Sequence, residues 1–297
     1  MSEEEAAIRP GQRIEAAFAG LAMHLFGMLS RRHASALGGW IARLIGPRLG
    51  ITRRARRNLA RALPDLDKAA QDQAILEMWD NLGRVVGEFP HLRTMDAFTA
   101  DAAIQATGLE HVDAAIARGK PLIFYSGHFG NWEVAALTAS LCGLKLAAVY
   151  RAANNPLVDR MMIALRRDLG ADPIPKGAQG ARKILSAIKA GQSLCMLVDQ
   201  KMNDGIAVPF FGRDAMTAPA IAELALRYDC TVLPARVERL PGARFQVTVF
   251  PPHDLPASGD KAADVLSLMT LINRTLEGWI RARPGQWFWL HRRWPDS

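Results

Sequence analysis

The stretch that decides the fold is residues 121–133, which read PLIFYSGHFGNWE. Its first half is a short apolar run bounded by Pro121 and Gly127, a pattern typical of a buried β-strand. Residues 131–141 then have the spacing of a helix. His128 therefore falls on the turn after the strand, and Glu133 falls in the first turn of the helix. A strand, a tight turn and a helix in this order predict one unit of an α/β fold.

The same alternation continues through the rest of the chain. Helices of crossover length between strands imply parallel strands covered on both faces. We therefore expect an α/β fold with a mostly parallel central sheet flanked by helices. The strands are predicted at residues 121–126, 145–150, 172–175, 193–198, 231–238 and 244–250, and the helices at residues 109–118, 131–141, 156–169, 178–190, 219–228 and 262–283.

The first part of the chain has a different pattern, because helical spacing prevails up to about residue 105. We predict two parts: an N-terminal helical membrane-associating module over residues 1–105, and an α/β catalytic domain over residues 106–297. Within the first part, helices are expected at residues 58–63, 71–86 and 97–106, with Pro64 separating the first two.

Charge is concentrated in the N-terminal part. The chain has a net charge of +8, and residues 31–61 contain nine arginines with no lysine, aspartate or glutamate. Nucleic acid and an anionic membrane surface are the candidate partners. Residues 16–29 and 34–46 are mostly apolar, but both are shorter than the roughly 18–20 residues that span a bilayer. We favour helices lying in the membrane interface and no nucleic acid, with a spanning helix over residues 14–30 as the alternative.

Several common chemistries lack their motifs. The three cysteines (Cys142, Cys195 and Cys230) are far apart and form no C-x-x-C pair, which favours a reduced protein. No H-E-x-x-H, G-x-S-x-G, G-x-G or Walker A sequence occurs. We therefore expect no metal, no nucleotide cofactor and no serine nucleophile.

Polar side chains follow three of the predicted strands. His128 and Glu133 come after the strand at 121–126, Arg151 after the strand at 145–150, and Asp199 and Gln200 after the strand at 193–198. Ligands of open α/β sheets bind beyond the carboxyl ends of the strands. These side chains are therefore predicted to meet at one edge of the sheet.

The pair His128 and Glu133 has the equipment for proton abstraction. A neutral imidazole is a base near neutral pH, and a carboxylate fixes its tautomer. Asn131 is predicted to cap the helix that contains Glu133. Gly127 and Gly130 allow close backbone approach, so free amides near Gly130 are predicted to face a developing oxyanion.

Spacing alone does not single out this pair. Histidine precedes aspartate by five positions twice more, at His91 with Asp96 and at His291 with Asp296. Only His128 lies between a predicted strand and a predicted helix, so only this pair is interpreted as catalytic.

The run GHFGNWE at residues 127–133 resembles the catalytic motif of the late acyltransferases of lipid A biosynthesis, within the wider lysophospholipid acyltransferase group. Further similar pieces follow in the family's order: YR at 150–151, NP at 155–156, DQ at 199–200, VPFFG at 208–212 and QWFWLHRRW at 286–294. The resemblance covers essentially the whole chain.

The resemblance implies an activity. A fatty acyl chain would pass from an acyl carrier protein thioester to a hydroxyl of a lipid A precursor. The protein would act at the cytoplasmic face of the cell inner membrane, held peripherally or monotopically by its N-terminal helices. His128 would be the general base and Glu133 its partner, with no cofactor beyond the acyl donor.

The resemblance also supplies substrate-binding candidates: Gly130, Asn131, Arg151, Asp199, Gln200 and Phe211. Arg151 would bind a phosphate or the oxyanion, unless it pairs with a nearby aspartate. Asp199 would contact sugar hydroxyls or hold the following loop. Phe211 would border an acyl tunnel or belong to the core. The aromatic tail fits an interfacial belt and a packed lid equally well.

Three other functions stay open on the sequence. The same chemistry could act on a lysophospholipid, a phosphoinositide mannoside or an aminolipid, with acyl-CoA as donor. A hydrolase would use the same base on water. A non-catalytic basic protein would bind anionic lipid or nucleic acid and would not depend on His128 or Glu133.

Overall fold

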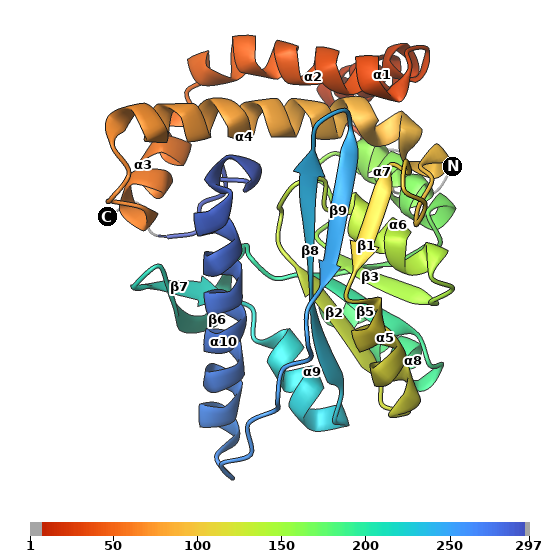
Figure 1. Ribbon diagram of the computed structural model, residues 1–297, viewed down its shortest axis with the longest axis vertical. Coiled ribbons are helices and arrows are strands. Elements are labelled where there is room, and N and C mark those ends of the chain that lie inside the picture. Colours follow the sequence, from red (N-terminus) through yellow and green to blue (C-terminus); the bar gives the residue numbers. More distant parts are fainter. Residues whose placement is uncertain (1–7, 295–297) are drawn as a thin grey trace.

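The computed structural model describes residues 8–294 and places seven strands in one central sheet (Figure 1). They are β1 (Ile104–Thr107), β2 (Leu122–Ser126), β3 (Leu146–Tyr150), β4 (Ala171–Pro175), β5 (Ser193–Leu197), β8 (Thr231–Leu240) and β9 (Arg244–Val249). Their order across the sheet is β1-β9-β8-β2-β5-β3-β4. Neighbouring strands are parallel except β8 and β9. The predicted mostly parallel sheet is confirmed.

Helices cover both faces of this sheet. α5 (Leu109–Ala117) and α6 (Glu133–Leu141) pack on one face. The other face packs against α8 (Ala178–Lys189), α9 (Ala220–Tyr228) and α10 (Lys261–Ala282), whose apolar side chains share a core with Ile123 and Tyr125. Because both faces are covered, all residues of β2 are buried. The remaining helix of this part, α7 (Pro156–Asp168), joins β3 to β4.

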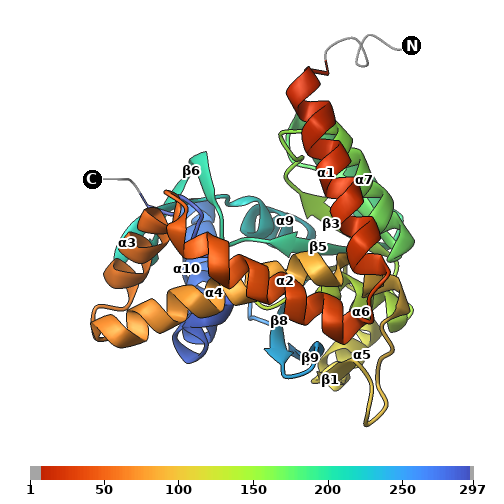
Figure 2. The same ribbon diagram turned by 90° about the horizontal axis from the view of Figure 1, so that it is seen from above.

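Four further helices precede the sheet: α1 (Pro10–Gly27), α2 (Arg31–Ile45), α3 (Thr52–Ala62) and α4 (Lys68–Glu88). α4 lies across the carboxyl end of β8, and α2 lies on the outer side of α4 (Figure 1). α1 runs beside α7 (Figure 2). Short 3-10 turns follow α2 (η2, Gly46–Arg48), α4 (η3, Phe89–Thr94) and α10 (η4, Pro284–Gln286). The N-terminal part is thus helical, as predicted, and it covers the end of the sheet at which ligands are expected.

The two outermost helices keep large apolar side chains in contact with solvent. Phe18 of α1, Met28 at the C-cap of α1 and Trp40 of α2 are 68%, 73% and 55% exposed. No helix within residues 8–294 is both long enough and apolar enough to cross a membrane. Association of these helices with a membrane surface stays a prediction.

Residues 97–106 do not form the predicted helix. Ile104–Thr107 is the edge strand β1, which pairs in parallel with β9. A turn precedes it, in which the Ala103 N–H donates to Asp96 Oδ1 (3.0 Å) and the Phe98 N–H donates to the Ile104 carbonyl (3.0 Å). Ala103 and Ile104 are buried against the sheet, while Phe98 is 45% exposed, so strand pairing overrides the helical spacing of this segment. The predicted boundary after residue 105 falls inside this strand.

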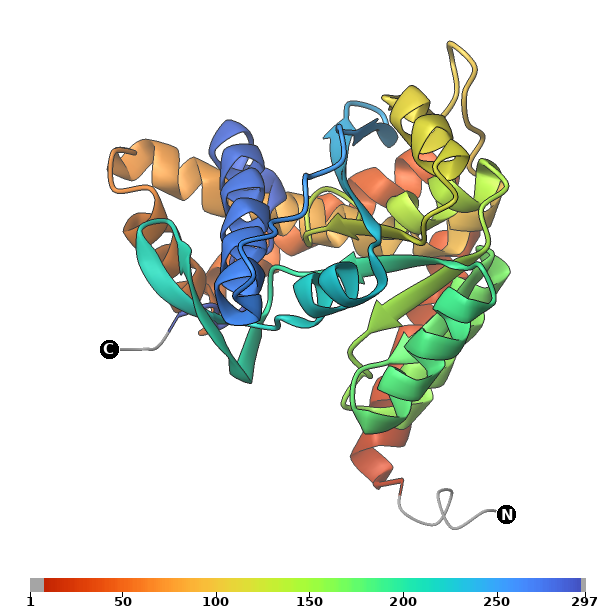
Figure 3. The same ribbon diagram turned by 90° about the horizontal axis from the view of Figure 1, so that it is seen from below.

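A β-hairpin replaces the loop that the sequence predicted after Asp199. β6 (Lys201–Phe210) and β7 (Arg213–Thr217) pair antiparallel beside α10 (Figure 3). The two turn residues, Phe211 and Gly212, have φ of 53° and 69°, the left-handed conformation that two-residue hairpins require. Apolar and polar residues alternate only weakly along β6, because the register of its pairing with β7 shifts between Lys201 and Ile206.

Candidate active site

The polar residues predicted at three strand ends do meet. β5 lies between β2 and β3, so the carboxyl ends of these strands are neighbours. A cavity of about 210 Å³ opens at this place. His128, Arg151 and Gln200 line it, together with three residues that the sequence interpretation missed: Trp132, Arg166 and Lys176. The predicted convergence is confirmed for His128, Arg151 and Gln200.

His128 is held by Asp199, which comes from the end of β5. The two share contacts through both the ring and the main chain: Nδ1 of His128 lies 2.7 Å from Oδ1 of Asp199, and the His128 N–H donates to Oδ2 at 2.7 Å. Trp287 donates its indole N–H to the same Oδ2 at 2.8 Å. Asp199 is 1% exposed and His128 is 17% exposed. A buried carboxylate with three donors thus fixes one side of the imidazole.

The electrostatics favour an ionised Asp199. Burial alone would raise the pKa of this carboxyl. The charge of His128, its two hydrogen bonds and the bond from Trp287 outweigh burial and hold the pKa of Asp199 well below its usual value of 3.8. In the neutral form of the ring, an ionised partner at Nδ1 favours the tautomer that carries its proton there, so that the lone pair of Nε2 is available as a base. Nε2 lies 3.2 Å from Nε2 of Gln200, which also lines the cavity.

Glu133 is not the carboxylate that contacts His128, which corrects the predicted pairing. It is buried at the start of α6 and binds Arg166 of α7 through both oxygens: Nη2 donates to Oε1 at 2.6 Å and Nε donates to Oε2 at 3.1 Å. Glu133 is the first residue of α6, whereas Asp199 follows the end of the neighbouring strand β5 and contacts the imidazole directly. Glu133 therefore reaches the cavity through the guanidinium of Arg166.

Gly130 and Asn131 are turned away from the cavity. The Gly130 N–H donates to the Gln286 carbonyl at 3.0 Å, so the prediction that this amide is free for an oxyanion is wrong. Asn131 is fully buried and donates Nδ2 to Glu88 Oε2 at 2.9 Å. It does not cap α6, whose N-cap is Trp132. Neither residue lines the cavity that contains His128.

Phe211 and the tail form an aromatic cluster behind the pair of His128 and Asp199. Phe211 is 7% exposed, and its ring centroid lies 6.4 Å from that of Trp289 and 6.3 Å from that of Trp294. Trp287 and Trp289 are also buried. The packed interpretation of the tail therefore holds, and Phe211 lies in the core rather than at the cavity with His128.

Arg151 hydrogen-bonds Asn154 (3.2 Å) and forms no ion pair with an aspartate within residues 8–294.

The tail also pairs with the turn that contains His128. The Phe288 N–H donates to the His128 carbonyl at 3.1 Å, next to an antiparallel bridge between Phe129 and Trp287. No spacing rule links residues so far apart. In the sequence, only the high density of tryptophan distinguished the tail.

Of the two other histidine pairs, His91 binds the Phe26 carbonyl (3.0 Å) away from the cavity. Asp296 lies outside the described residues.

With this geometry in place, comparison with known proteins decides the family. The family model described as bacterial lipid A biosynthesis acyltransferase matches residues 11–296. The chain belongs to this family. It is an acyltransferase, and its relatives act on glycolipids.

Three relatives show the range within the lipid A acyltransferase family. A phosphatidylinositol mannoside acyltransferase of Mycobacterium tuberculosis is 27% identical over 83% of this chain and 78% of its own length. A lipid A biosynthesis lauroyltransferase of Escherichia coli is 24% identical over 80% and 76%. A lipid A biosynthesis acyltransferase of Haemophilus influenzae is 22% identical over 80% and 73%. The catalysed reaction class is therefore shared, while the acceptors named for these relatives differ.

Proposed function

We propose that the protein moves a fatty acyl chain from an acyl carrier protein thioester to a hydroxyl of a lipid A precursor, with His128 as general base. One observation carries this proposal: the His128 ring is bound at Nδ1 by the buried Asp199 carboxylate (2.7 Å), and the same ring lines a cavity at the strand ends. This arrangement orients a base toward a space large enough for reacting groups.

The transfer follows from this geometry. Nε2 of His128 takes the proton of the acceptor hydroxyl, whose oxygen attacks the thioester carbonyl carbon. Asp199 stabilises the imidazolium that forms, because its charge lies against the Nδ1 proton. The tetrahedral intermediate collapses, the carbon–sulfur bond breaks, and the departing thiolate receives the proton from Nε2. The products are an ester and a free thiol.

The charge that develops on the carbonyl oxygen needs donors within the cavity. The Gly130 amide is engaged by Gln286, so side chains take this role in the proposal. Arg151 and Arg166 both line the cavity, and Glu133 holds the Arg166 guanidinium in a fixed orientation through two hydrogen bonds. We assign oxyanion or phosphate binding to these two arginines, since guanidinium groups bind such anions in a bidentate manner.

The acceptor is a lipid, and the proposal places the protein on the cytoplasmic face of the inner membrane. Support comes from the outward apolar side chains of α1 and α2, which are interspersed with the basic residues Arg13, Arg32 and Arg43. Replacing Phe18 and Trp40 by serine should reduce co-sedimentation with anionic vesicles about tenfold or more. Leu141→Ser removes an exposed leucine (47%) from α6 and is the control, expected to bind like the parent.

A second acceptor has an observation in its favour. The mycobacterial relative named for a phosphatidylinositol mannoside is 27% identical, against 22–24% for the lipid A relatives given above. Transfer to a mannosylated phosphoinositide is therefore the alternative. The hydroxyl acceptor, the base and the thioester step are the same in both cases.

Lipid mass spectrometry separates these acceptors. Cells with and without the protein, and cells with His128→Ala, are compared for lipid A and for phospholipids. We expect one secondary acyl chain of lipid A to be missing without the protein and with His128→Ala. An unchanged lipid A with a deacylated glycosylated phosphoinositide supports the alternative acceptor. Full acylation by His128→Ala at equal protein level contradicts the general-base assignment.

A further inference from the structure

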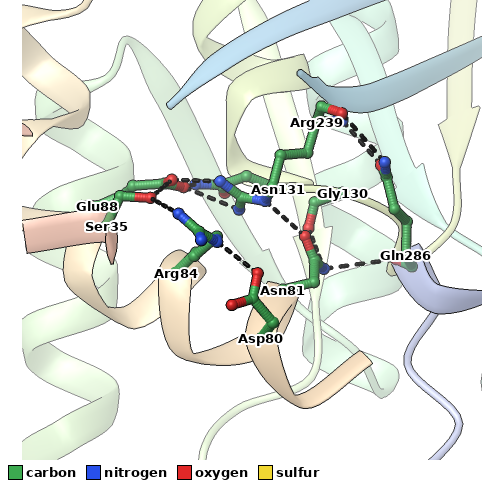
Figure 4. A network of polar contacts seen from close by, with 9 residues as sticks. All are labelled: Ser35, Asp80, Asn81, Arg84, Glu88, Gly130, Asn131, Arg239 and Gln286. Carbon is green, nitrogen blue, oxygen red and sulfur yellow. Dashed lines mark hydrogen bonds and ion pairs between the residues drawn. The ribbon is translucent and has the colours of Figure 1, made fainter. Parts of the chain in front are cut away.

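A buried polar network lies behind the catalytic turn and joins three separate parts of the chain to it (Figure 4). Asn81 and Glu88 come from α4, Arg239 from the end of β8, and Gln286 from the tail. Glu88 is fully buried, and the Arg239 side chain is 9% exposed. Such groups are costly to bury unless their partners are well placed, so their geometry is narrowly defined.

Two of these residues hold Gly130 directly. Asn81 donates Nδ2 to the Gly130 carbonyl at 2.9 Å, and the Gln286 carbonyl accepts the Gly130 N–H at 3.0 Å. Gly130 has φ of +56°, and a Cβ there would lie 2.3 Å from the Val237 carbonyl oxygen. The main chain two residues after His128 is therefore fixed at both of its polar groups, in a conformation that only glycine fits.

Arg239 ties these contacts together. Its Nε donates to Asn81 Oδ1 at 2.7 Å, and its guanidinium binds both oxygens of Glu88. The amide side chain of Gln286 accepts from the Arg239 N–H (2.8 Å) and donates to the Arg239 carbonyl (3.1 Å). Asn81, Arg239 and Gln286 thus form a closed ring of hydrogen bonds around Gly130.

Glu88 extends the network to Asn131 and to α2. Its Oε2 accepts from Asn131 Nδ2 (2.9 Å), and its Oε1 accepts from Ser35 Oγ of α2 (2.7 Å). α2 is held tightly to α4, since a Cβ on Gly38 would lie 2.3 Å from the Gly83 carbonyl oxygen. The helix with exposed Trp40 is thus connected to the catalytic turn through a rigid contact.

We propose that Asn81, Glu88, Arg239 and Gln286 are positioning residues for His128, so that the N-terminal helices complete the catalytic turn as well as meeting the membrane. The inference rests on the proposed function. These residues do not line the cavity with His128 and touch no reacting atom. They act by setting the path of residues 128–131, and a displacement of about 1 Å in a reacting group can cost on the order of 10²-fold in rate.

Asn81→Asp is the sharpest test, because it is nearly isosteric and removes only the Nδ2 donor, which binds the Gly130 carbonyl at 2.9 Å and the Gln286 carbonyl at 3.5 Å. The Oδ1 acceptor for Arg239 remains, but the donor to the Gly130 carbonyl is replaced by an oxygen. We expect kcat for transfer from an acyl carrier protein thioester to fall about 10- to 100-fold, with KM for the donor within about twofold. Circular dichroism and a thermal melt should show a folded protein.

Gln286→Glu gives the same test from the other end of the ring. It keeps the acceptor for the Arg239 N–H and loses the donor to the Arg239 carbonyl, and the same selective loss of kcat is expected. Glu238→Gln is the matched control. It removes a carboxylate next to Arg239 in sequence, one that binds Arg236 (2.6 Å) outside the network, and it should leave kcat within about twofold.

His128→Ala in the same assay distinguishes failure of the positioning role from failure of the proposed function. If His128→Ala is inactive while Asn81→Asp and Gln286→Glu both match Glu238→Gln, the positioning role is wrong and the proposed function stands. If His128→Ala transfers normally, the proposed function itself fails. A loss in both network variants that appears in KM and melting temperature rather than in kcat also overturns the positioning role.

Discussion

The two sides of the turn that contains His128, residues 127–131, are built differently. The front side faces a cavity and presents His128, whose partners Asp199 and Gln200 come from the next strand end. The back side faces α4 and presents Gly130 and Asn131 to a buried network. Residues only two or three positions apart in the motif thus face a cavity on one side and a structural frame on the other.

This difference shows what a short motif can specify. On the front side, His128 lines a cavity that Arg151, Arg166 and Lys176 also line, which is the charge that the proposed oxyanion needs. The back side has its polar groups paired inside the protein, apart from Asn131 Oδ1, which is buried without a partner among the described residues. Gly130 and Asn131 of the motif therefore belong to the frame, whereas His128 faces the cavity.

Asp199→Asn should have the largest effect on the front side. The His128 N–H and the Trp287 indole N–H both donate to Oδ2, so the asparagine oxygen will take that position. Its NH2 group then faces Nδ1 of His128 and forces the proton to Nε2, which removes the base. We expect kcat to fall about 10²- to 10⁴-fold with normal circular dichroism. A loss below about tenfold in single-turnover transfer contradicts the His128–Asp199 dyad.

The sequence predicted the front side well, and the reason is topological. Parallel strands share a carboxyl edge, so Arg151 and Asp199 were expected near His128 without any knowledge of distances. The identity of the partner was not predictable in the same way. The H-x4-E spacing suggested Glu133, whereas Asp199 is 71 positions from His128 and only the strand order β2-β5 brings them together.

The back side was not predicted, because it has no local pattern. Asn81 and Glu88 lie on an amphipathic helix, where polar residues are usually solvent-facing. Arg239 and Gln286 are separated from them by more than 150 residues. The error at residues 97–106 has the same origin: pairing of β1 with β9 depends on a distant strand, and apolar spacing does not reveal it.

Glu133→Gln tests how the one carboxylate of the motif contributes. The glutamine oxygen can keep one bond to Arg166, but the charge and the bidentate contact are lost. We expect kcat to fall about tenfold, clearly less than for Asp199→Asn, and stability to fall by about 1–3 kcal/mol. Arg166→Lys should show a similar loss, since it breaks the same contact from the other side. Equal losses for Glu133→Gln and Asp199→Asn would support direct action of Glu133 on His128.

His291 provides the smallest expected effect, on stability rather than on rate. It lies near the front side, where burial lowers its pKa to about 4. Below pH 6.5 the unfolded chain binds a proton at this ring while the folded protein does not, so stability is lost as the pH falls from 6.5 to 4. The free energy of unfolding should differ by about 2 kcal/mol between pH 7 and pH 5.

His291→Gln retains an acceptor for the Lys201 N–H and has no ring to titrate. Its denaturant midpoint should therefore change less between pH 7 and pH 5 than that of the parent protein. Asp199 does not interfere, because its depressed pKa affects stability only below about pH 3.8. Equal pH slopes in the two proteins would mean that the folded protein protonates His291 as readily as the unfolded chain does.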